Sequence, residues 1–110
     1  MKNYVQKGEN LTLTAPRDLK SGEGFLVGAI FAVASAAAVQ GAPVVGVTEE
    51  VFDLPKAAGA VTPGSKAYWD NTAFVVTTNA SGTVLIGAFT QAAASGDANG
   101  RVKLTGQIAA

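Results

Sequence analysis

The segment at residues 41–48, GAPVVGVT, has the glycine spacing of the nucleotide-binding P-loop GxxxxGK[ST]. In a P-loop, a lysine reaches the β- and γ-phosphates, and backbone amides at the start of a helix hold the phosphate oxygens. Val47 stands where that lysine should be, and no strand-to-helix pattern surrounds the segment. We therefore expect a valine-rich entry into a strand here, with no nucleotide site.

The acidic residues do not form a catalytic pair. Glu49 and Glu50 are adjacent carboxylates, but neighbours on an extended strand point to opposite faces and cannot flank one substrate bond. We expect them at a solvated strand edge. Asp53 and Asp70 each follow an aromatic residue without a partner at a catalytic spacing, which favours strand-end or turn roles.

The chain contains neither histidine nor cysteine. Histidine is the usual general base near neutral pH and a common metal ligand, and cysteine supplies thiolate nucleophiles, disulfides and sulfur ligands. Their absence predicts a protein that is not an enzyme and that has no catalytic residue, no cofactor and no metal site.

Length and charge limit the remaining classes of protein. A chain of 110 residues is the size of one domain, so we expect a single domain over residues 1–110. Eight basic and eight acidic residues balance, and the basic residues are scattered, which argues against nucleic acid as a partner. Charged residues make up only 15% of the chain, and this low charged fraction suggests burial against other protein chains.

Residues 24–48 carry no charge and begin with the apolar run GFLVGAIFAVASAAAV. A hydropathy scan would mark them as a membrane span or a displaced signal sequence. Interruption by Gly28, Gly41, Pro43 and Gly46, and a polar stretch ahead of the segment, argue against both interpretations. We therefore expect no membrane partner.

Short apolar or alternating runs separated by glycine, proline and polar turns predict β-strands along the chain. The clearest hairpin has the turn Asp70-Asn71-Thr72 between two apolar runs. A helix over residues 29–39 is an open alternative, because alanine favours helix, although that run lacks a charged outer face. The expected strands lie near residues 10–15, 25–28, 29–33, 44–47, 51–54, 67–69, 74–78, 84–89 and 101–104.

About seven to nine short strands with no long periodic helix predict an all-β fold, a small single-domain β-barrel or β-sandwich. Residues 1–8 are expected to form an extended arm. Tyr68 and Trp69 adjoin in a strand, so one ring should face the core and the other outward, with packing of both in the core as the alternative.

Five segments together resemble the capsid cement, or head decoration, family of bacteriophages. The most specific are VFDLPKA within residues 47–57 and the AYWD hairpin within residues 63–78. Residues 1–16, the apolar run at 24–34 and GRVKL at 100–104 extend the likeness over nearly the whole chain. Members of this family are sometimes labelled RecA/RadA-type recombinases, a label that the missing P-loop lysine contradicts here.

The resemblance implies a β-rich structural subunit, a homotrimer, on the outer capsid surface of the virion after synthesis in the bacterial cytoplasm. Its partners would be the major capsid protein and its own copies, and its function would be to bridge capsid subunits and stabilise the head. Within that interpretation we expect Tyr4 and Val5 of the arm, together with Tyr68 and Trp69, at a capsid or subunit interface, with the arm adding as a strand to the capsid.

Two other functions remain open from the sequence. One is another virion component, either a tail tube or a head-completion subunit. The other is a small β-barrel enzyme or ligand-binding module, which a concave pocket with convergent polar groups would favour.

Overall fold

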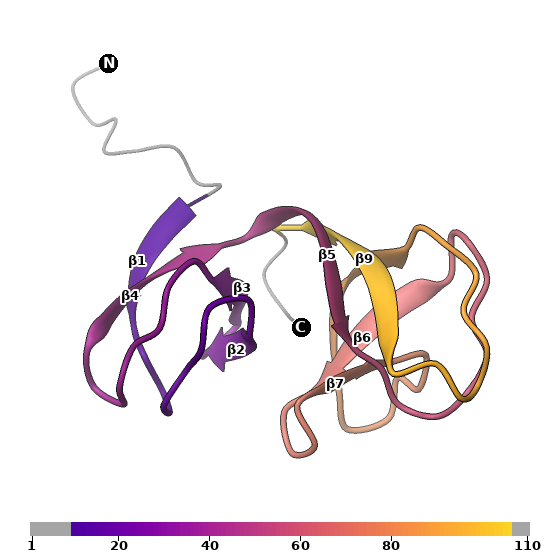
Figure 1. Ribbon diagram of the computed structural model, residues 1–110, viewed down its shortest axis with the longest axis horizontal. Coiled ribbons are helices and arrows are strands. Elements are labelled where there is room, and N and C mark those ends of the chain that lie inside the picture. The colour runs from indigo at the N-terminus through magenta and orange to yellow at the C-terminus, as the bar shows by residue number, and fades with distance from the viewer. Residues whose placement is uncertain (1–9, 107–110) are drawn as a thin grey trace.

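The structure is a computed structural model that describes residues 10–106, and this part of the chain forms nine β-strands and no helix (Figure 1). All strand pairs within the sheets are antiparallel. The first sheet has the order β1-β4-β3-β2 and the second the order β5-β9-β8-β6-β7. The bounds are β1 Asn10–Thr14, β2 Gly24–Val27, β3 Ile30–Ala34, β4 Pro43–Val47, β5 Glu49–Pro55, β6 Lys66–Asp70, β7 Val75–Thr77, β8 Val84–Phe89 and β9 Asn99–Thr105.

These strands confirm the all-β prediction, and each expected strand coincides with an observed one to within a few residues. The helix alternative for residues 29–39 is wrong: β3 occupies the first part, and turns and irregular chain follow. Ala32 and Ala34 are buried in β3 rather than spaced along a helix face. A Cβ placed on Gly46 of the adjacent strand β4 would collide with Ala32, so this part of the sheet requires small residues.

The two sheets are consecutive in the sequence. β4 ends at Val47 and β5 begins at Glu49, so Thr48 alone connects the two sheets, and the ribbon passes from one to the other without a loop (Figure 1). The strands expected near residues 44–47 and 51–54 correspond to β4 and β5. They are two strands in different sheets, with a buried Thr48 between them.

The second sheet curls toward closure and forms a half-barrel. Its edge strands β5 and β7 approach each other where Lys56 and Val76 form an isolated parallel bridge. The amide of Ala57 donates a hydrogen bond to the carbonyl of Val76 at 2.9 Å. In the middle of this sheet the pairing of β6 with β8 shifts between Ala67 and Tyr68.

The largest hydrophobic core belongs to both sheets. Phe31 and Val33 of β3 pack in the same cluster as Trp69, Leu54 and other buried residues of the second sheet. The Phe31 and Trp69 rings lie 4.9 Å apart and are tilted by 53°. A second, smaller cluster under the other face of the first sheet contains Ala15, Leu19, Phe25, Ala32, Ala34 and Val44. β3 is therefore buried on both faces, as its unbroken apolar sequence predicts.

Within residues 10–106, no helix could serve as a membrane crossing. The uncharged run at residues 24–48 instead supplies β2, β3 and β4.

Candidate functional site

A groove lies between the two sheets. It has a volume of about 220 Å³. The β1–β2 connection supplies one wall, and the second sheet with its β6–β7 turn supplies the other. The lining residues are Arg17, Lys20, Ser21, Gly22, Glu23, Gly24, Pro55, Trp69 and Phe74.

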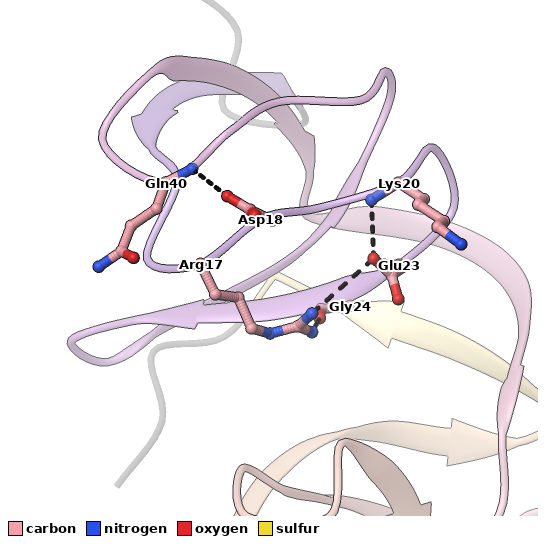
Figure 2. Close-up of polar contacts among 6 residues, drawn as sticks. All are labelled: Arg17, Asp18, Lys20, Glu23, Gly24 and Gln40. Atoms are coloured by element: carbon pink, nitrogen blue, oxygen red, sulfur yellow. Dashed lines mark hydrogen bonds and ion pairs between the residues drawn. The ribbon is translucent and has the colours of Figure 1, made fainter.

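Arg17 joins the two walls of this groove. Its guanidinium carbon lies 4.0 Å from the centre of the Phe74 ring, a cation–π contact across the sheets. Arg17 Nη2 also donates a hydrogen bond of 2.6 Å to the carbonyl of Gly24, and Nη1 lies 3.8 Å from Glu23 Oε1 (Figure 2). The guanidinium is thus engaged by β2, by its own loop and by the facing sheet.

The carboxylates of this loop bind backbone amides. Glu23 Oε1 accepts a hydrogen bond of 2.7 Å from the amide of Lys20, and Asp18 Oδ1 accepts one of 2.8 Å from the amide of Gln40 (Figure 2). Asp18 thereby fastens the β1–β2 connection to the β3–β4 connection. Such side-chain caps stabilise turns, so the convergent polar groups serve the fold of the loop.

The acidic residues singled out from the sequence take structural positions. Asp70 Oδ1 accepts hydrogen bonds from the amides of Thr72 and Ala73 and so closes the predicted hairpin turn. Asp53 in β5 pairs across the sheet with Arg101 in β9: Arg101 Nε donates to Asp53 Oδ1 at 3.0 Å and Nη2 to Oδ2 at 3.3 Å. This hydrogen-bonded arginine lowers the pKa of the Asp53 carboxyl.

Glu49 and Glu50 are both exposed on β5, an edge strand of the second sheet, as expected.

The P-loop-like segment, residues 41–48, does not form a phosphate-binding loop. Its residues from Pro43 to Val47 form β4, which pairs with β1 on one side and β3 on the other, so the segment forms strand ladders in place of a phosphate cradle.

Within residues 10–106, no three acidic side chains gather in a way that could hold a metal ion.

The four predicted interface residues lie in three different settings. Trp69 is 1% exposed and packs in the shared core, where its indole Nε1 donates a hydrogen bond to Asn71 at 3.0 Å. Tyr68, its neighbour on β6, is half-buried on the opposite, outward face, which confirms the expected alternation of the two rings. Tyr4 and Val5 lie outside the described residues, as does the whole predicted arm, residues 1–8. A role for these residues at an interface remains a prediction.

The sequence did not single out Lys56, which the structure shows to be buried. Lys56 is 8% exposed, and its ammonium donates hydrogen bonds to the carbonyls of Ala57 at 2.9 Å and Gly59 at 2.8 Å. Arg17 and Phe74 were missed because they contact each other across a long sequence separation, which leaves no local pattern. An arginine close before a long uncharged segment was the only local signal.

The strands of the two sheets differ in charge, whereas the β1–β2 connection of the first sheet carries Arg17, Asp18, Lys20 and Glu23. The four strands of the first sheet contain no charged residue. The strands of the second sheet contain seven: Glu49, Glu50, Asp53, Lys66, Asp70, Arg101 and Lys103. Exposed valines on or beside the first sheet, Val45 at 42% and Val39 at 66%, add to its apolar character. Charged residues are depleted at the centres of protein–protein interfaces, so the uncharged strands are the part of the described chain best suited to such a centre.

Together, the nine strands in two antiparallel sheets define the described chain as a small all-β protein. A family model described as phage cement protein matches residues 5–104. The chain therefore belongs to the phage cement protein family, whose members are structural proteins of the phage capsid. No curated protein and no solved structure matches the chain.

Proposed function

We propose that this protein binds the outer surface of the phage capsid and stabilises the head by bridging neighbouring major capsid protein subunits. The family match over residues 5–104 is the observation that carries this proposal. A capsid stabiliser holds subunits together and needs no catalytic residues. The structure is consistent with such a role because the carboxylates of Asp18 and Glu23 bind backbone amides of the same chain.

The charge asymmetry supports a choice of docking side. Burying a charged side chain against a protein surface is costly unless the charge is paired. The strands of the first sheet can be covered without that cost as long as the charged β1–β2 connection stays outside the contact. We therefore assign capsid contact to the side of the first sheet. The outward face of the second sheet, where Lys66, Arg101 and Lys103 are exposed, would then face away from the capsid.

We further propose that the whole chain, residues 1–110, acts as one decoration unit and assembles as a trimer. A symmetric oligomer contacts several capsid subunits at once, so that weak individual contacts combine through effective concentration. Residues 1–8 would reach the capsid and add as a strand to a capsid sheet edge, with Tyr4 and Val5 as anchors. Tyr68, half-buried on the outward face of β6, is proposed to serve a subunit contact.

The direct test is binding of the purified protein to expanded phage heads that lack it, measured by co-sedimentation. Electron microscopy of heads with and without the protein would then show whether added density bridges capsid subunits. We expect binding to expanded heads and higher resistance of the decorated heads to heating. Heads that bind no protein, or that bind it without gaining stability, would contradict the proposed function.

The arm has its own test within this system. Deletion of residues 2–8 should weaken binding to expanded heads while the circular dichroism spectrum of the β fold is retained. Undiminished binding would rule out the arm as a capsid anchor and leave the remainder of the proposal in place.

Copy number separates the proposal from a role elsewhere in the virion. Quantitative mass spectrometry of purified particles should find this chain at an abundance near that of the major capsid protein. A tail or head-completion subunit would be far scarcer.

A further inference from the structure

Three of the four edge strands carry a feature that protects them from pairing with another chain. Natural sheets protect their edges with charged side chains, proline, very short strands or covering segments, because an open edge offers unpaired amides and carbonyls to any neighbour. β5 contains Glu49, Glu50, Asp53 and Pro55. β7 has only three residues, and the amide of Ala57 binds the carbonyl of Val76 at its middle.

The edge of β2 is covered by Arg17. Glu23, the residue before this strand, directs its carbonyl to β3, where it accepts a hydrogen bond from the amide of Ala34 at 2.9 Å. Backbone groups alternate in direction along a strand, so the carbonyl of Gly24 points away from β3. That carbonyl accepts the 2.6 Å hydrogen bond from Arg17 Nη2 (Figure 2).

β1, the remaining edge strand, has none of these features among the described residues. Its five residues, NLTLT, include no charge and no proline, and they pair with β4 in an unbroken register. β4 covers one side of β1, and no strand of the described chain covers the other. An uncharged, regular edge of this kind is suited to pairing with another strand.

Two backbone hydrogen bonds determine which amides and carbonyls of β1 face the open side. Ala15 donates a hydrogen bond of 2.9 Å to Ala42, and the amide of Ser35 donates to the carbonyl of Val45 at 3.0 Å. With the alternation of an antiparallel ladder, these bonds direct the amides and carbonyls of Leu11 and Leu13 to β4. The amides and carbonyls of Thr12 and Thr14 therefore face the open edge.

Two copies of β1 can pair antiparallel with matching residue types opposite each other. An antiparallel pair of two β1 strands centred on Thr12 places each Leu11 opposite the partner's Leu13, and Thr12 opposite the partner's Thr12. Leucines then meet on the half-buried face and threonines on the exposed face. The same register aligns the edge-facing backbone groups of the two strands, and because β1 is uncharged no like charges are brought together.

From this geometry we infer that β1 pairs antiparallel, about a two-fold axis through Thr12, with β1 of a second copy of this chain. The pair joins two four-stranded sheets into one continuous sheet. An isologous contact of this kind uses the same surface on both subunits. The inference does not depend on capsid binding. Because no two-fold axis relates the subunits of a three-fold ring, the β1 pair would join copies from two different trimers.

This contact is small, because five residues of edge bury much less than the roughly 1,200 Å² of a stable interface. Pairing is therefore expected to be weak in dilute solution and to strengthen where other contacts hold copies near each other, as on a particle surface. Disulfide cross-linking detects such a weak contact better than a measurement of the protein's mass in solution alone.

Cysteine substitution tests the register, since the chain has no cysteine of its own. In the inferred pair, the two Thr12 Cα atoms lie about 5.5 Å apart, within the range that a disulfide spans. Thr12→Cys should therefore form a two-chain band on a non-reducing denaturing gel under mild oxidation. The control is Thr14→Cys, equally exposed on the same strand, whose two copies would be about 14 Å apart.

Mixing Asn10→Cys with Thr14→Cys should restore cross-linking, because residue 10 of one copy then faces residue 14 of the other. Cross-linking of Thr14→Cys alone as fast as Thr12→Cys would contradict the inferred register. Failure of Thr12→Cys to cross-link at high protein concentration would overturn the pairing itself.

A second variant tests pairing without chemistry. Thr12→Pro removes an amide that faces the open edge and leaves the β4 ladder intact, a placement that edge strands tolerate. Sedimentation at high protein concentration, where the weak pair is populated, should show that Thr12→Pro loses the two-chain species, whereas Thr12→Val retains it. Equal association of both variants would count against the pairing. Cross-linking of Thr12→Cys only after deletion of residues 2–8 would also count against it, because the edge of β1 would then belong to the chain's own preceding segment. Thr12→Pro that no longer associates but still binds heads would leave the proposed function intact.

Discussion

At the residue scale, the charged side chains of this protein maintain its shape. Arg17 holds the edge of β2 and the ring of Phe74, and Asp18 fastens one connection to another. The sequence identified Asp53 and Asp70 as structural residues from the absence of catalytic partners. It could not find their actual partners, because Arg101 lies 48 positions from Asp53 and a contact of that separation leaves no local pattern.

The Asp53–Arg101 pair gives a prediction for titration. Replacement of Arg101 by glutamine should raise the pKa of Asp53 toward its ordinary value of 3.8, because the hydrogen-bonded arginine is what lowers it. The side-chain carboxyl shift of Asp53, followed by NMR in both proteins, measures this change. The same titration in Lys103→Gln, on the same strand, is the control and should leave the Asp53 curve unchanged.

The sign of the stability effect follows from the lowered pKa. The contribution of Asp53 to folding is present above the pKa it has in the unfolded chain, and it is lost as the pH falls through the lower pKa of the folded state. Both side chains are about half exposed, at 53% for Asp53 and 45% for Arg101, so the effect should be small and weaker in high salt.

At the scale of the elements, the strands were predictable and their neighbours were not. Apolar runs, alternation and turn residues located all the observed strands, and Asp70-Asn71-Thr72 located one hairpin. Nothing local shows that β1 lies beside β4, or that β4 and β5 belong to different sheets. Those pairings are determined by which faces pack together, a property of the folded chain.

Lys56 carries a prediction about the closure of the half-barrel. Lys56→Met keeps the length of the side chain but leaves the carbonyls of Ala57 and Gly59 without their donor. We expect a loss of about 1–2 kcal/mol in the free energy of unfolding, measured by urea denaturation, because two hydrogen bonds from a charged donor are lost, although water can reach the carbonyl of the exposed Gly59. Faster hydrogen exchange at Ala57, whose amide binds Val76, should accompany it.

The control for this change is Lys66→Met, which removes the same charge from an exposed position on β6. It should alter stability by no more than about 0.5 kcal/mol. Equal effects of the two substitutions would show that Lys56 acts through net charge and not through its two hydrogen bonds.

At the scale of the whole molecule, the distribution of charge predicts how binding to heads responds to salt. If the uncharged first sheet faces the capsid, raising the ionic strength from about 0.1 M to 1 M, which shortens the screening length from about 10 Å to 3 Å, should change the affinity little. Co-sedimentation with expanded heads across this range measures the effect. A steep loss of binding would assign the contact to the charged second sheet instead.

The single-residue connection at Thr48 has a mechanical consequence. Residues 10–47 form one sheet and residues 49–105 the other, and Thr48 is the only covalent crossing between them in the described chain. A longer linker would have slack and would stretch before it transmitted tension. Here a tensile force on one sheet is transmitted directly to the other through the backbone of Thr48. A capsid subunit that moved outward while bound to this protein would therefore place both sheets under tension together.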